Sequence, residues 1–117
     1  MGNRVGVIFH EDWKEFSPLM YSHYGAELIS FAIQDFVKEY YKEHDIKNYT
    51  DGHEYDPCHM MVGFIQFIDK DIHIRIENLE QFQIEKLKSK HEYPNCFDGG
   101  CLIINVSRKH YGEIISN

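Results

Sequence analysis

The residues best suited to holding a ligand stand where an extended segment meets an amphipathic helix, in the block Ser22-His23-Tyr24-Gly25. The first backbone N–H groups of a helix lack acceptors within the helix, and the helix dipole adds partial positive charge at the same place. A small residue flanked by Ser, His and Tyr therefore predicts an anion site suited to a phosphate. The alternative is structural, because Ser also begins helices as an N-cap.

The three arginines, Arg4, Arg75 and Arg108, each flank or lie within an expected strand. Arginine is the preferred side chain for a fixed, two-pronged phosphate contact, and Arg108 with Lys109 and His110 forms the most compact basic cluster. Among them, Arg108, Lys109 and Arg75 are our candidates for contacting phosphates. The alternative is that the arginines pair with some of the 19 acidic residues at the surface.

Histidine and cysteine are numerous, but their spacing does not form a metal motif. Structural zinc ligands usually come as close pairs such as C-x-x-C or H-x-x-x-H, and neither pair occurs in this sequence. The pair Ser22-His23 lacks the third partner of a nucleophilic site, and the glycine patterns of phosphate-binding loops are missing. We therefore expect no metal, no cofactor and no catalysis. The enzymatic alternative is a phosphodiesterase that uses His23 and His110.

Composition limits the classes of partner. The chain has 117 residues, of which 43% are hydrophobic and 15% aromatic, enough for one folded domain. Its net charge of −7 argues against binding long nucleic acids, whereas a small nucleotide needs only a few placed cations. No apolar run approaches the roughly 20 residues of a membrane span, so we expect a cytoplasmic protein with free thiols. Phe82 and Phe97 lie in polar segments, where they could stack on a base or cap the core.

The elements that must position these residues begin with a β-hairpin. The runs RVGVIF at 4–9 and FSPLMY at 16–21 predict its two strands, with Pro18 at an edge or at an unpaired position. Apolar residues at helical spacing predict a helix from Glu27 to Tyr41. A charged, turn-rich loop is expected over 42–56.

The second half predicts one more helix and two strands. Asp56-Pro57 is a good helix start, and the helix continues to Ile68, with Gly63 allowing close packing. The alternating IHIRI at 72–76 predicts a strand with its isoleucines inward, and CLIINV at 101–106 predicts a buried strand. Glu77–Lys90 is compatible with strand or helix, and we favour a short strand or loop and a polar connection. The expected fold is α+β, one small domain with two helices packed on a largely antiparallel sheet.

Three segments, RVGVIF, SPLMYSHYGAEL and DGGCLIINV, resemble a family of small phage and prophage proteins. These proteins run from an NRV-type strand into a YSH-x-G helix start and end in a D-x-G-x-x-x-I-D-like strand. The pattern is similar to that of the type 1 group of anti-Thoeris sponge proteins. The resemblance implies a phage protein that sequesters, without cleaving, the cyclic ADP-ribose isomers made by bacterial TIR-domain defence enzymes. It also implies a homodimer or higher assembly with nucleotide pockets between subunits, and some members look able to hold other cyclic nucleotides.

The resemblance assigns ligand contacts residue by residue. Ser22, His23 and Tyr24 match the helix-start block, and Asp98 matches the late turn, while Arg108 is the best phosphate contact. The resemblance also assigns Phe82 and Asn95, whereas Lys109 and Arg75 are candidates from the placement of the basic residues alone. The chain departs from the family pattern at three positions: Tyr24 where a Trp is expected, Ala26 for a second Gly, and Asn105 where the last strand would carry Asp.

Overall fold

A computed structural model describes residues 4–22, 26–43, 56–68, 72–91, 101–106 and 113–116; for 26–27, 41–43 and 113–116 it describes only the backbone. The predicted hairpin is confirmed. Strand β1 (Val5–Glu11) pairs antiparallel with β2 (Glu15–Phe16) and then with β3 (Leu19–Ser22). The second arm of the hairpin is thus split into two strands.

The split occurs at Ser17-Pro18, because proline has no N–H to give to the ladder. Ser17 makes up for the lost pairing on both sides of Phe9. Its backbone N–H donates to the Phe9 carbonyl at 2.8 Å, and its hydroxyl accepts from the Phe9 N–H at 3.0 Å. The same hydroxyl donates to the Pro18 carbonyl at 2.8 Å. Pro18 lies outside the ladder as expected, but β3 itself is an interior strand and not an edge.

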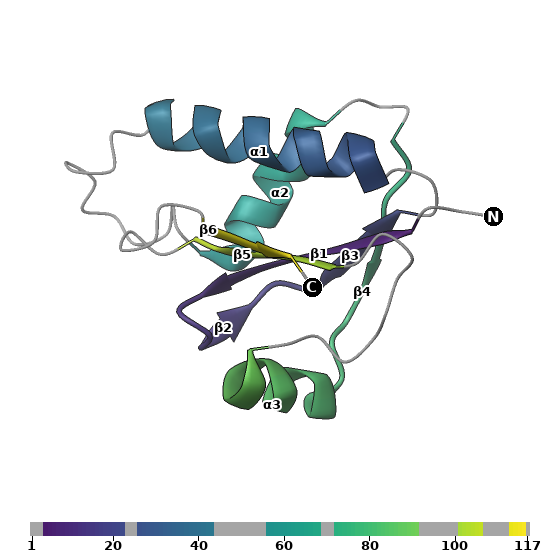
Figure 1. The fold of residues 1–117 in the computed structure, drawn as a ribbon, viewed down its shortest axis with the longest axis vertical. Helices are drawn as coiled ribbons and strands as arrows, with labels where there is room; N and C mark the ends of the chain where they lie inside the picture. Colours follow the sequence, from purple (N-terminus) through teal and green to yellow (C-terminus); the bar gives the residue numbers. More distant parts are fainter. Residues whose placement is uncertain are drawn as a thin grey trace.

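Two helices cover one face of the sheet (Figure 1), α1 (Ala26–Glu43) and α2 (Pro57–Phe67). Both were predicted. Asp56 caps α2 by accepting from the His59 N–H at 3.2 Å, and Pro57 occupies the first helical position. The predicted loop over 42–56 overlaps the end of α1, and its residues 44–55 lie outside the described part of the chain.

Aromatic rings fill the space between these helices and the sheet. Phe36 of α1 meets Phe9 of β1 and Phe64 of α2 edge-on, with ring centroids 6.4 and 5.6 Å apart. A Cβ added to Gly63 would lie 3.3 Å from the Phe36 ring. The glycine therefore allows the close packing that the sequence suggested, at the expense of helix propensity.

The sheet has the strand order β4-β3-β1-β5-β6, with β2 joined to β1. Strand β5 (Cys101–Asn105) is buried throughout, as predicted, and runs parallel to β1; the other pairs are antiparallel. Strand β6 (Glu113–Ser116) was not predicted. The class is α+β, as expected from the sequence.

A third helix, α3 (Gln81–Lys90), packs on the opposite face of the sheet (Figure 1), where a polar connection was expected. The prediction was wrong because α3 has no apolar stripe: Leu87 is its one buried residue. Its ends carry the helix signals instead. Glu80 and Gln83 form a capping box, and His91 ends the helix in the left-handed conformation.

The two faces of the sheet bury separate clusters. Val7, Phe9 and Leu102 belong to the cluster under α1 and α2, whereas Ile8 and Ile103 belong to the one under α3. This division follows the alternation of side chains along a strand. A sheet covered on both faces explains why β1 and β5 are apolar almost without interruption.

The predicted strand over 72–76 is shorter and less buried than expected. Strand β4 (Arg75–Glu77) starts later, and the side chain of Ile76 is 51% exposed, although we expected it inward. Ile72 and Ile74 are partly buried against the core. Because β4 is an edge strand with a neighbour on one side only, its outer residues gain little cover.

Candidate functional site

The turn between β1 and β2 holds the single Trp of the chain in an unusual backbone conformation. Asp12 and Trp13 have φ of 49° and 61°, and the Lys14 N–H donates to the Glu11 carbonyl at 3.0 Å. Positive φ at both central residues is typical of type I′ turns, which favour Asn and Gly. A residue with a large side chain is retained there at a cost of about 1–3 kcal/mol, a strain that often accompanies function.

Interactions from two strands hold this turn in place. The backbone N–H of Trp13 donates to Nδ1 of His10 at 3.0 Å, which requires that Nδ1 carries no proton. From β5, Asn105 exchanges two hydrogen bonds with Asp12, one to its backbone N–H at 3.2 Å and one to its carboxylate at 3.3 Å. The turn is therefore tied to the interior of the sheet.

The Trp13 indole lies between two histidine rings. On one side is His10, fully buried, with a centroid distance of 4.1 Å and an angle of 32° between the ring planes. On the other side is His91, exposed, at 4.0 Å and 2°. The second pair is a nearly parallel stack at the boundary of core and solvent.

A surface groove of about 510 Å³ lies between the hairpin that carries Trp13 and the helix that ends at His91, and its volume is within the size range of small-molecule sites. It lies between the β1–β2 hairpin, the start of α2, the segment after β4, and α3. Its lining residues are Lys14, Phe16, Ser17, Pro18, Cys58, Asn78, Leu79, Ile84 and Lys88. The groove thus has an apolar floor with one lysine from the hairpin and one from α3.

Negatively charged carboxylates lie near the hairpin, close to the groove but not among its lining residues. Burial raises the pKa of Glu11, and the negative charges of Glu15, Asp12 and Asp56 raise it further, while Lys14 lowers it. Burial, followed by Asp56 and Glu15, also raises the pKa of the groove thiol, Cys58. The groove therefore offers ammonium groups for an anion, and the carboxylates of Glu15 and Asp56, which do not line it, act on its thiol from nearby and can accept from hydroxyl or amino groups.

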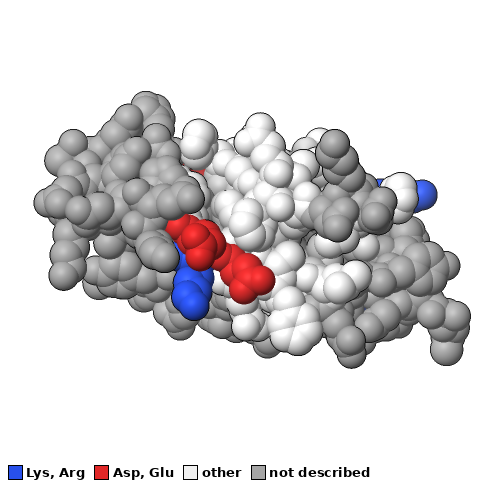
Figure 2. All heavy atoms as spheres, turned by 90° about the horizontal axis from the view of Figure 1, so that it is seen from above, with Lys and Arg blue, Asp and Glu red and all other residues white. Residues whose placement is uncertain are grey.

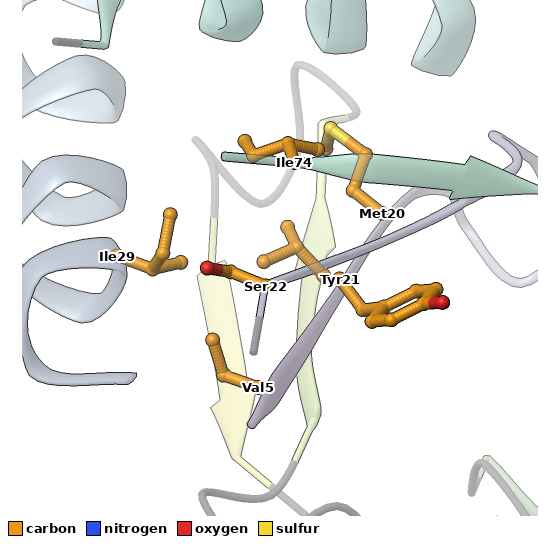
Figure 3. Close-up of a pocket in the computed structure, with 7 residues that line it drawn as sticks. Val5, Met20, Tyr21, Ser22, Ile29 and Ile74 are labelled. Carbon is orange, nitrogen blue, oxygen red and sulfur yellow. The ribbon is translucent and has the colours of Figure 1, made fainter. Parts of the chain in front are cut away.

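The structure describes three of the predicted ligand residues, and it does not bring them to this groove. Ser22 is the last residue of β3, and the described part of α1 starts at Ala26, so the helix-start block between them, and with it the N-cap alternative for Ser22, lies outside the described residues. The side chain of Ser22 is buried and lines a narrow pocket between β1, β3 and α1 (Figure 3), which is too small for a water molecule.

Arg75 and Phe82 lie elsewhere. Arg75 is exposed on β4 and stands opposite Tyr21 of β3 in the strand register. Because side chains alternate along a strand, that of Arg75 lies on the opposite face of the sheet from that of Ser22. Phe82 is 53% exposed on α3 and does not line the groove. The remaining predicted contacts lie outside the described residues: His23, Tyr24, Asn95, Asp98, Arg108 and Lys109.

The sequence did not single out Trp13, Lys14, Lys88 or His91. The first two belong to the stretch HEDWKE, which was interpreted only as a polar break. Lys88 belongs to the helix that was not predicted, and His91 is the residue that ends it. One signal could have located that helix, because Glu80 and Gln83 have the three-residue spacing of a capping box.

Both described cysteines, exposed Cys58 and buried Cys101, are free thiols, as expected. In the described part of the chain, no three His, Cys, Asp or Glu side chains gather as a metal site would require. None of the described helices has the length and apolar character needed to cross a membrane. Comparisons with protein-family models, curated proteins and solved structures find no match to this chain.

Proposed function

We propose that this protein captures a small nucleotide-type signal in the groove between the hairpin and α3 and holds it without cleaving it. The sequence resemblance suggests the ligand, a cyclic ADP-ribose isomer, and the role, a phage protein that blocks TIR-based bacterial immunity. The observation that carries the proposal is the pair Lys14 and Lys88 on a groove of nucleotide size.

The two lysines suit the phosphates of such a ligand. They come from different elements, so a diphosphate placed between them would contact both the hairpin and α3. Lysine binds phosphate as a point charge, and charge-assisted hydrogen bonds are about twice as strong as neutral ones. Contacts from two sides bury more of a small ligand than a flat surface can.

The rest of the groove suits the remainder of a nucleotide. Leu79 and Ile84 offer apolar surface, and the carboxylates of Glu15 and Asp56 lie close enough to Cys58 to raise its pKa. Ribose hydroxyls and an exocyclic amine are donors that such carboxylates accept. Because sequestration requires affinity for the ground state, the site needs no group aimed at a transition state.

Isothermal titration calorimetry with a cyclic ADP-ribose isomer tests the proposal. We expect Lys14→Ala and Lys88→Ala each to weaken binding by about 1.5–3 kcal/mol, the range for hydrogen bonds to charged groups. Lys86→Ala is the matched control, since Lys86 is an exposed α3 lysine that does not line the groove. Wild-type affinity in both groove variants contradicts the assignment of the site.

Arg108 provides a separate test of the resemblance. If it contacts a phosphate, Arg108→Ala weakens binding by a similar 1.5–3 kcal/mol. An unchanged affinity removes Arg108 from the site and leaves the groove lysines as the phosphate contacts.

A second candidate function, a protein-binding module, is favoured by an exposed apolar surface on α1. Leu28 and Phe31 are 61% and 65% exposed and lie one helical turn apart. Acidic side chains lie beside uncharged surface on this side of the molecule (Figure 2), and Asp35 and Glu39 on α1 are exposed. With a net charge of −7, this surface suits a partner that is basic and apolar.

This alternative predicts a protein complex whose stability falls with salt and which Phe31→Ser disrupts, together with no nucleotide binding. Pull-down with wild type and Phe31→Ser in parallel distinguishes the two functions. Nucleotide binding that Phe31→Ser leaves unchanged favours capture in the groove.

A further inference from the structure

The Trp13–His91 stack has the geometry of a base on an indole. The ring planes are 2° from parallel and the centroids 4.0 Å apart, and flat π-systems of bases are recognised by stacking on aromatic side chains. The inner face of Trp13 is already covered by buried His10, so the face beneath His91 is the one open to exchange.

The stack joins the same two elements that carry the groove lysines, although neither ring lines the groove itself. Lys14 directly follows Trp13 in the turn, and Lys88 stands three residues before His91 at the end of α3. A nucleotide whose phosphates lie between the two lysines therefore has its base within reach of the indole. On the hairpin, Lys14 and Trp13 are adjacent in sequence. On α3, Lys88 and His91 are about one helical turn apart.

The two rings differ in how firmly they are held. The backbone of Trp13 is fixed by its hydrogen bond to His10 and by the neighbouring Asp12–Asn105 pair. Its side chain packs against the cluster under α3. His91 is exposed, and the bond that ends the helix comes from its backbone, with its N–H donating to the Leu87 carbonyl at 3.1 Å. Rotation of the His91 side chain alone would uncover the indole and leave α3 in place.

We infer that Trp13 is the stacking platform for the base of the captured nucleotide, and that His91 occupies the place of the base in the ligand-free protein. This inference rests on the proposed function, because it assigns the base of the same ligand to the hairpin turn and the end of α3, next to the groove lysines. A purine presents a larger π surface than an imidazole, so exchange of His91 for a base increases the stacked area.

The two members of the stack then have opposite effects on affinity. Trp13→Leu removes the platform and weakens nucleotide binding by roughly tenfold or more. His91→Asn removes the competitor and tightens binding by roughly two- to tenfold, since the competent state becomes more populated. Asn is chosen because His91 has a φ of 56°, which Asn tolerates. A purely structural stack would make both variants weaker binders.

The experiment compares a cyclic ADP-ribose isomer with inorganic pyrophosphate, which has no base, by calorimetry and by tryptophan fluorescence. Trp13 is the single Trp, so its emission reports on this site alone. We expect the nucleotide to change that emission with the same affinity that calorimetry gives. Pyrophosphate should bind wild type and Trp13→Leu equally, which also shows that Trp13→Leu is folded; Trp13→Phe, which keeps a ring, should retain intermediate nucleotide affinity.

The outcomes separate the inference from the function on which it rests. Equal nucleotide affinity in wild type and Trp13→Leu, with Lys88→Ala still weakening it, overturns the stacking role and leaves capture in the groove intact. Weaker binding in His91→Asn overturns the exchange of rings. Failure of wild type to bind either probe overturns the groove itself.

Discussion

Asp12 and Asn105 hold each other across the end of the sheet, although 93 positions separate them in sequence. The Asp12 N–H donates to Oδ1 of Asn105 at 3.2 Å, and Nδ2 of Asn105 donates to Oδ1 of Asp12 at 3.3 Å. Asn105 is 4% exposed, so its amide supplies a donor and an acceptor in a place with little water. The pair joins β5 to the strained turn that carries Trp13.

This arrangement predicts the effect of Asn105→Asp, the residue expected from the sequence resemblance. The new carboxylate cannot donate to Asp12, and two like charges would face each other at hydrogen-bond distance. We expect the free energy of unfolding at pH 7 to fall by about 1–3 kcal/mol. Because repulsion raises the pKa of the pair in the folded state, the loss should shrink as the pH falls.

The matched control is the double variant Asp12→Asn with Asn105→Asp, which restores a donor facing a carboxylate. Urea unfolding at several pH values should show recovery of most of the lost stability at pH 7. If the double variant is no more stable than Asn105→Asp, the two side chains are not coupled.

Leu87 should be the main anchor of α3, because it is the one buried residue of that helix. Leu87→Ala removes its methyl groups from the cluster with Ile8 and Ile103, and we expect a loss of about 2–5 kcal/mol of unfolding free energy. Amide exchange in α3 should accelerate more than in α2. Phe82→Ala, at a 53% exposed position of the same helix, should change stability by no more than about 0.5 kcal/mol. Equal losses in the two variants would contradict the packing of α3 described above.

Thiol labelling should distinguish the two described cysteines. Burial raises the pKa of Cys101 to about 12, so it stays protonated and covered in the folded protein. Cys58 is exposed, but its pKa is also raised, so it should react more slowly than free cysteine at the same pH. In a Cys96→Ser background, one thiol should react before denaturation and the second only afterwards. Reaction of both in the folded protein would show that the sheet does not bury Cys101.

Glu11 should make stability depend on pH. Its pKa in the folded state is raised from 4.5, chiefly by burial, so the folded protein holds this proton more tightly than the unfolded chain. The contribution of Glu11 to the free energy of unfolding therefore decreases as the pH rises from 4.5 through the pKa of the folded state. Above that pKa the loss of stability stays constant. Glu11→Gln should stabilise the protein at pH 7 by less than about 1 kcal/mol, since the group is partly solvated. The gain should disappear near pH 4, and thermal unfolding at the two pH values checks this; an equal gain at both would exclude titration of Glu11 as the cause.

The sequence predicted the elements whose apolar pattern matches their period. The β1–β3 hairpin, α1, α2 and β5 all bury a face or both faces, and burial is what the pattern records. Helix α3 was not predicted because a single leucine attaches it, so its sequence is polar nearly all round. The inward side of Ile76 was mispredicted because alternation identifies the faces of a strand but not whether anything covers them.

The groove and the ring stack were beyond prediction for a different reason. Trp13 and His91 meet only because a turn with positive φ and the end of α3 converge over one face of the sheet. Nothing in the local sequence of either residue indicates the other. Lys14 and Lys88 are likewise ordinary surface lysines until the third helix places them on two sides of one groove.

The most direct test of the central claim is recovery of the ligand. The protein is mixed with a stoichiometric amount of a cyclic ADP-ribose isomer, separated from unbound nucleotide, and denatured by heat, and the released nucleotide is identified by mass spectrometry. We predict intact cyclic ligand from wild type and much less from Lys14→Ala and Lys88→Ala. Release of linear product only would identify an enzyme and contradict sequestration, and absence of nucleotide in the protein fraction would contradict binding.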